Sequence, residues 1–178
     1  MAWLQSFHLS FLLAAAALMV AAAVNDARAF KISNWIWLSL LALFPLYVLS
    51  APEPLAWPHH LGVFVLVFGI GFALFAGHFA GAGDVKLLAA ASLWAGPNFI
   101  GVLLVVTGLA GGVLAIGYAL NAWLHYRKQP PVVNGGAGNA GADGNLLHAM
   151  KNEPIPYGIA IAVGGIAAFG MMIEPVLF

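Results

Sequence analysis

Long apolar runs alternate along the chain with short polar or proline-containing breaks. A helix that crosses a membrane needs roughly 20 mostly apolar residues, with a range of about 17 to 25. Runs of this kind predict about six helices, at Phe7–Val24, Trp35–Ser50, His60–Phe79, Asp84–Ala95, Asn98–Leu124 and Pro156–Ile173. The pattern therefore predicts an all-α polytopic membrane protein with about six transmembrane helices.

The fourth predicted helix is unusual because its apolar run, Val85 to Trp94, is short for a full crossing. The next three residues, Gly96-Pro97-Asn98, form a strong turn signal. The following run is too long to form a single helix with the fourth. We therefore expect a fourth helix that is tilted or partly buried and separated from the fifth by a turn.

The composition supports a membrane location. Hydrophobic residues make up 63% of the chain and charged residues 7%, and the mean hydropathy is +0.97, whereas about a quarter of residues are charged in soluble domains. The lipid bilayer is the partner that this composition implies. The formal net charge of +0 leaves no basic surface for nucleic acid. The absence of Cys excludes disulfides, thiol catalysis and cysteine-ligated zinc.

The basic residues predict the orientation in the membrane. With about six crossings they all fall on one side, and that side should be cytoplasmic by the positive-inside rule; they are Arg28, Lys31, Lys86, Arg127, Lys128 and Lys151. The first apolar run is expected to be a retained helix, because no Lys or Arg precedes it as in a signal peptide. We therefore expect a multi-pass protein of the inner, cytoplasmic membrane, with both termini outside the cytoplasm.

One long polar segment, residues 126–154, interrupts the single membrane domain that we predict for residues 1–178. Its Gly, Asn and Ala content cannot build a core, so we expect a flexible cytoplasmic loop. The run Gly136-x-Gly138-x-x-Gly141 matches a dinucleotide-binding fingerprint by letter, but no strand precedes it. We expect no cofactor.

Two carboxylates stand at the ends of apolar runs. Asp26 follows the first run, Asp84 opens the fourth, and the predicted topology places both at the cytoplasmic boundary. Ionisable groups at membrane depth are costly and are usually functional. Hydrolysis of a peptide by carboxylates needs two that share one proton, one ionised and one protonated. Gly81 and Gly83 suit this chemistry, because glycine permits unusual backbone angles and close approach of a substrate strand.

Three passages resemble a known family: Asp26 to Asn34, Gly81 to Leu87, and Pro156 to Ala162. The chain is similar to the prepilin peptidases of the type IV leader-peptidase group, which are membrane aspartyl proteases with a glycine-any-glycine-aspartate motif. The resemblance implies that Asp26 and Asp84 are the catalytic pair. It also implies that the protein cuts the short basic leader from pilin-like precursors at the cytoplasmic face.

Details of the motif passages refine this resemblance. Gly81, Gly83 and Lys86 are the motif positions expected beside the substrate, although Lys86 also suits a topology determinant or a lipid headgroup contact. Ser33 stands where the family usually has proline. The missing Cys and the short first loop, Asn25 to Asn34, resemble the peptidase-only members of Flp-type tight-adherence pili, so we expect no methylation. An archaeal preflagellin peptidase is a closely related alternative.

Structural and functional alternatives remain for these residues. Asp84 suits a helix N-cap, and Asp26 suits an interfacial acid that balances Arg28 or Lys31. A small ion- or proton-coupled transporter would use both acids as relay groups, although it would want them near the bilayer midplane. A non-catalytic assembly subunit would leave the paired acids unexplained.

The histidines predict no metal site. No carboxylate cluster accompanies His59 and His60, and adjacent residues on a helix point in different directions. We expect His78 to bond to backbone at the interface rather than to tune the carboxylates.

Overall fold

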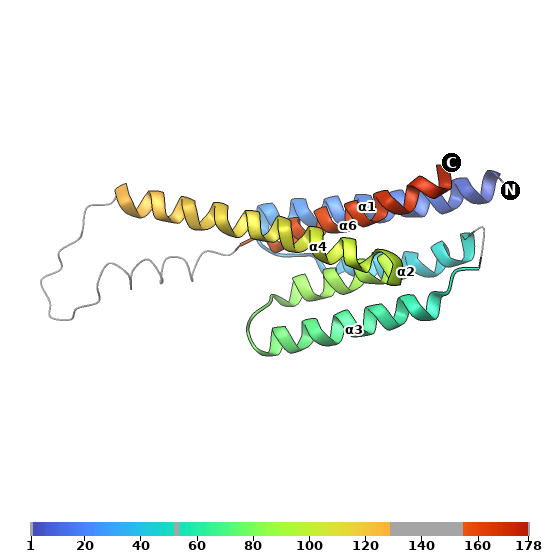
Figure 1. Ribbon diagram of the computed structural model, residues 1–178, viewed down its shortest axis with the longest axis horizontal. Coiled ribbons are helices and arrows are strands. Elements are labelled where there is room, and N and C mark those ends of the chain that lie inside the picture. The colour runs from blue at the N-terminus through green and yellow to red at the C-terminus, as the bar shows by residue number, and fades with distance from the viewer. Residues whose placement is uncertain (1, 52–53, 129–154, 178) are drawn as a thin grey trace, which may run out of the picture. The chain divides into compact units, whose positions relative to one another are not determined.

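The computed structural model describes residues 2–51, 54–128 and 155–177. Every element in this part of the chain is a helix: α1 (Ala2–Ala29), α2 (Asn34–Ser50), α3 (Trp57–Ala76), α4 (Ala82–Lys128) and α6 (Tyr157–Leu177) (Figure 1). The predicted all-α class is confirmed. The helices follow from the apolar runs, and α3 begins with Pro58 in its first turn, where a missing amide hydrogen costs no helical bond.

α4 consists of two helical halves that meet at Gly96. This glycine has φ 58° and ψ −169°, which no residue in a helix adopts, and Pro97 follows it. The turn predicted at Gly96-Pro97-Asn98 is therefore present, and the predicted fourth and fifth helices correspond to residues 82–95 and 97–128. The chain changes direction at this point (Figure 1).

His60 packs directly against this break. A Cβ atom on Gly96 would clash with the His60 ring, so the ring occupies the space that glycine leaves. His60 is buried, and its Nδ1 donates to the Leu93 carbonyl at 2.8 Å. Leu93 needs this donor because the residue four positions on, Pro97, has no amide hydrogen. His60 thus satisfies a carbonyl that the turn leaves without a helical partner.

Trp94 joins three helices in the core. It is fully buried, and its Nε1 donates to the Leu40 carbonyl of α2 at 3.0 Å. Its ring centroid lies 5.0 Å from that of Tyr47 and 5.9 Å from that of Phe44, both on α2, and 6.0 Å from that of Phe169 on α6. A buried indole usually finds a partner for its N–H, and a backbone carbonyl fills that need here.

α6 packs closely against its neighbours through glycines. A Cβ on Gly165 would come within 3.0 Å of Met19 Sδ on α1, and a Cβ on Gly164 would meet the Leu103 carbonyl and Thr107 of α4. Helices in membranes associate through small residues because lipid supplies no hydrophobic drive between them. These glycines therefore determine how near α6 lies to α1 and α4.

Three helices are long and apolar enough to cross a membrane: residues 7–29 of α1, all of α3, and residues 82–124 of α4. The protein is thus a membrane protein, whereas about six crossings remain a prediction. α2 and residues 157–173 of α6 are shorter apolar helices. α1 extends past the predicted Val24 to Ala29, so Asp26 lies inside the helix rather than after it.

The chain divides into two compact units, one formed by residues 1–111 and 156–178 and the other by residues 112–155. The prediction of one domain over residues 1–178 is not tested by this division. The predicted loop begins later than expected, because α4 continues to Lys128 and includes residues 126–128. The rest of that loop, residues 129–154, lies outside the described residues.

Within the larger unit, successive helical segments run in alternate directions (Figure 1). The end of α1, the start of α4 and the start of α6 consequently lie at the same end of this unit, and the start of α1 and the end of α6 lie at the other. Segments that are distant in the sequence meet at the first of these ends.

Candidate functional site

The last turn of α1 fixes the backbone of Asp26. Phe30 adopts the left-handed conformation with φ 50°, and its amide donates to the Asp26 carbonyl at 2.9 Å. Helices commonly end on such a left-handed residue, although glycine usually takes the position. The side chain of Asp26 is buried, with 5% of its surface exposed.

The carboxyl of Asp26 lies at the start of α6. The Gly158 amide donates to Asp26 Oδ2 at 2.6 Å, and the Ile159 amide, which donates to the Pro156 carbonyl at 3.2 Å, also lies close to this carboxyl. The first amides of a helix have no partner inside the helix, and they attract negative charge. A carboxyl from the end of α1 therefore satisfies an amide at the beginning of α6.

Asp84 lies in the first turn of α4, where it bonds to backbone three residues earlier. The Gly81 amide donates to the Asp84 carboxyl, and the Val85 amide donates to the Gly81 carbonyl at 3.1 Å. This is the acid half of a capping box, in which the third helical residue reaches back to the capping position. The alternative that Asp84 is the N-cap itself is therefore wrong, because Gly81 precedes the helix and Asp84 lies within it.

Asp26 and Asp84 lie close enough for their charges to interact. The structure thus brings together the two predicted carboxyls from α1 and α4. In the described part of the chain, no Lys or Arg is among the groups that act on either carboxyl. No group of three or more metal-binding side chains occurs among those described residues.

Gly81 and Gly83 provide space rather than unusual backbone angles. Among the described glycines, only Gly96 has a positive φ, so neither Gly81 nor Gly83 adopts the left-handed conformation. A Cβ on Gly81 would lie 2.8 Å from Asp84 Oδ2, and a Cβ on Gly83 would lie 3.3 Å from the Ile32 Cβ. Gly81 leaves room for the carboxyl, and Gly83 leaves room for the link between α1 and α2.

Lys86 extends toward α2 and away from the carboxyls. Its Nζ donates to Asn34 Oδ1 at 3.4 Å and lies 5.4 Å from the centre of the Trp37 ring. A cation over an aromatic face is attracted by the ring quadrupole. These contacts connect the start of α4 with the start of α2.

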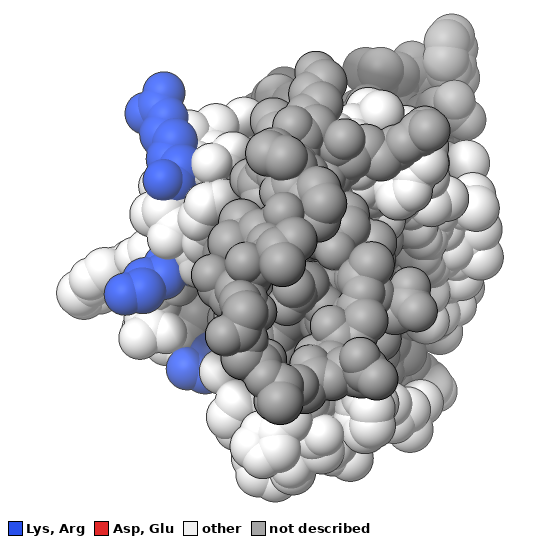
Figure 2. Space-filling view, turned by 90° about the vertical axis from the view of Figure 1, so that its left-hand side faces the viewer, with Lys and Arg blue, Asp and Glu red and all other residues white. Residues whose placement is uncertain are grey.

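The surface carries basic side chains at the end of the larger unit where α1 ends and α4 and α6 begin. Figure 2 shows Lys and Arg gathered along one side of it, with no acidic side chain at the part of the surface that is in view. Asp26 is buried and Asp84 is partly buried. The two acids are thus wholly or partly buried, whereas the nearby Lys and Arg side chains lie at the surface.

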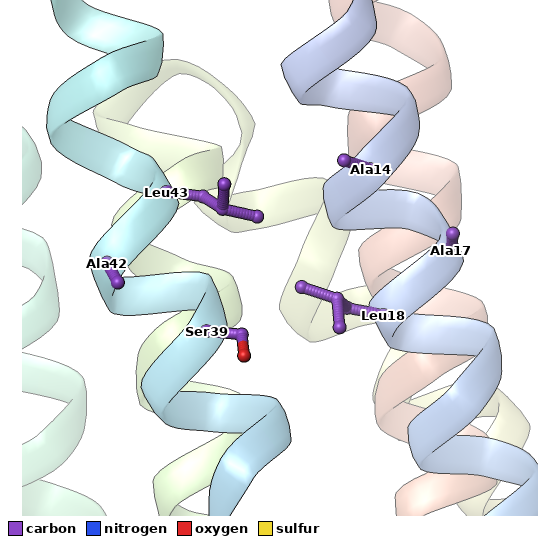
Figure 3. A pocket seen from close by; sticks show the side chains of 6 residues that line it. All are labelled: Ala14, Ala17, Leu18, Ser39, Ala42 and Leu43. Carbon is purple, nitrogen blue, oxygen red and sulfur yellow. The ribbon is translucent and has the colours of Figure 1, made fainter.

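A separate apolar pocket of about 540 Å³ lies between α1 and α2. Figure 3 shows Leu18 and Leu43 pointing into the space between these helices. Ser39 is its only polar lining residue, and the pocket includes neither carboxyl. Leu18 lies eight residues before Asp26, roughly 12 Å along the helix at 1.5 Å per residue.

Gly158 is the functional candidate that the sequence analysis did not assign. It belongs to one of the motif passages, yet no role follows from its letter alone. Its position in the first turn of a helix, directly after Pro156-Tyr157, is the signal that indicates an available amide. The amide's partner, Asp26, is distant in the chain and is known only from the fold.

The model of the type IV leader peptidase family matches residues 13–116. The chain belongs to the type IV leader peptidase family. This match includes Asp26 and Asp84 and ends before α6 begins. No curated protein and no solved structure matches the chain.

Membership in this family makes the protein a peptidase, and therefore a hydrolase, of the prepilin leader peptidase kind. Its substrate class is prepilin. The predicted resemblance to prepilin peptidases is confirmed, and the helices described above agree with a peptidase of the membrane.

Proposed function

We propose that this peptidase is an aspartic endopeptidase that cleaves the short basic leader from Flp-type prepilins at the cytoplasmic face of the inner membrane. The observation that carries the proposal is the convergence of Asp26 and Asp84. Helices that are distant in sequence bring these carboxyls close enough for their charges to interact. Ionising both members of such a pair costs more than ionising one, which favours a single shared proton.

The hydrolysis needs only water and this pair. The ionised carboxyl takes a proton from water as the water oxygen bonds to the scissile carbonyl carbon, and the protonated carboxyl gives its proton to the carbonyl oxygen. The resulting diol collapses as the carbon–nitrogen bond breaks. The first carboxyl then gives its proton to the leaving nitrogen, and the second recovers one from a diol hydroxyl. Both carboxyls return to their starting states.

The position of the pair favours a peptidase over a transporter. Asp26 lies in the last turn of α1 and Asp84 in the first turn of α4, near the ends of apolar helices. Relay carboxylates of a transporter are expected near the middle of the membrane. A leader outside the bilayer could reach carboxyls at the helix ends.

Purified protein incubated with an Flp-type prepilin tests the proposal. We expect the wild type to release the leader, and we expect Asp26→Asn and Asp84→Asn each to lower kcat/KM by at least about a hundredfold, because acid–base catalysis contributes that much or more. The double variant should be no worse than either single variant, because the two groups act as a unit. His59→Gln, an exposed residue, is the control and should retain activity.

Cleavage by either single variant at matched protein levels would exclude that aspartate from the mechanism. Failure of the wild type to cleave the prepilin, together with carboxylate-dependent proton flux in vesicles, would favour the transporter.

A further inference from the structure

The carboxyl of Asp26 lies where its own helix opposes a negative charge. The last carbonyls of α1 form the negative end of the helix dipole, which disfavours a carboxylate. Asp26 is also buried, so water does little to compensate. Something else must hold this side chain if it is to be ionised and directed at Asp84.

The start of α6 supplies hydrogen-bond donation to the Asp26 carboxyl. The Gly158 amide donates to Asp26 Oδ2 in a short hydrogen bond of 2.6 Å, and the Ile159 amide lies close to the same carboxyl. Short hydrogen bonds are typical of an ionised partner. Asp84 accepts from one backbone amide, that of Gly81, which directly precedes its helix. More backbone amides therefore lie at Asp26 than at Asp84.

Gly158 also shapes the space around Asp26. A Cβ on this glycine would lie 2.8 Å from Asp26 Oδ2 and 3.0 Å from both its Cβ and its Cγ. Distances below about 3.0 Å force something to move, and here the crowded atoms are the carboxyl itself. Any larger residue at this position would displace Asp26 from its donor.

We propose that Gly158 is a positioning residue that holds Asp26 ionised through its amide, so that Asp26 takes the proton from water and Asp84 donates to the scissile carbonyl. This inference rests on the proposed function and deepens it, since it divides the roles within the pair. Among the described residues, the charged side chain that interacts with Asp26 is Asp84 of α4, and the start of α6 presents its backbone amides to Asp26.

The test replaces Gly158 with Ala and compares it with Gly170→Ala. Gly170 lies on the same helix with no atom within 4 Å of an added Cβ, so it controls for the change in helix propensity. We expect Gly158→Ala to lower kcat about ten- to a hundredfold with KM within about twofold of wild type, because misplacing a catalytic group costs chemistry rather than binding. Gly170→Ala should match the wild type.

The pH profile separates positioning from a merely structural effect. Activity rises with pH as the base ionises, and loss of a hydrogen bond that favours the charged form delays this ionisation. The acid limb of kcat should therefore move about one pH unit higher in Gly158→Ala, which is a tenfold change in the ionisation equilibrium. An unmoved acid limb would overturn the assignment of Asp26 as the base.

Infrared titration supplies a readout that needs no activity. In the inactive Asp84→Asn background, the ionisation midpoint of Asp26 should be about one pH unit higher with Gly158→Ala than without it. An equal midpoint would overturn the inference even if the protein cleaves prepilin as proposed. If Gly158→Ala does not fold, an amide-to-ester replacement at position 158 removes the donor without adding a Cβ, and the same shift is expected.

Discussion

At the scale of single residues, Asp26 is held by a backbone amide rather than by a cation. Asn and Asp accept hydrogen bonds at helix N-termini about equally well. Asp26→Asn should therefore keep the contact with Gly158 while removing the charge. Loss of cleavage in that variant would thus report chemistry rather than a displaced α6.

A second residue with a clear energetic role is His60, and His60→Phe should destabilise the protein by about 1–3 kcal/mol. The variant keeps a ring against Gly96 but leaves the buried Leu93 carbonyl without its donor, and an unsatisfied buried group costs about that much. Thermal unfolding in detergent, followed by tryptophan fluorescence, measures the effect. The neighbouring exposed His59 provides the control His59→Phe, and equal unfolding of the two variants would contradict the role of His60.

At the scale of elements, the break in α4 decides whether residues 82–128 form one rod or two packed segments. The angles of Gly96 lie in a region that is essentially restricted to glycine. The turn allows Trp94, at the end of the first half, to meet α2 and α6. The helix that carries Asp84 is therefore anchored in the core at its opposite end.

Gly96→Ala should lower the stability by more than about 2 kcal/mol. The strained backbone costs about 1–3 kcal/mol, and the added methyl group would overlap the His60 ring, which adds a cost of similar size. The thermal midpoint in detergent is the measurement. Gly101→Ala, on the same helix with no atom near an added Cβ, should be neutral or slightly stabilising, and a Gly96→Ala variant as stable as this control would contradict the argument.

At the scale of the whole molecule, one end of the larger unit gathers helix ends that carry both carboxyls, Arg28 and Lys86, and the link between α1 and α2 that carries Lys31. Alternating helix directions produce this arrangement. The positive-inside rule then predicts that this end faces the cytoplasm.

Reporter fusions test that orientation. Fusions after Lys31, after Asp84 and within residues 135–144 should report the cytoplasm, whereas fusions near Glu53 and after Phe178 should report the outside. The physical reason is the retention of Lys and Arg on the cytoplasmic side during insertion. A cytoplasmic C-terminus would mean that the number of crossings is odd, with the short first half of α4 as the segment that fails to cross.

The sequence by itself determined the all-helical class, the membrane setting, the turn at Gly96 and the choice of Asp26 and Asp84 as candidates. These features depend on local composition: the length of apolar runs, the conformational limits of glycine and proline, and the cost of an acid beside an apolar segment. Each can be assessed without knowing which residues pack against it in the folded protein.

Only the tertiary structure decided which partners these residues meet. The bond from Gly158 to Asp26, the packing of His60 on Gly96 and the contact of Lys86 with Asn34 join residues that are distant in the sequence. The spacing of residues along one helix does not specify which helix packs against it or the distance between the two helices. Those are set by close packing at positions such as Gly164 and Gly165, where the absence of a side chain matters only once a neighbour is in place.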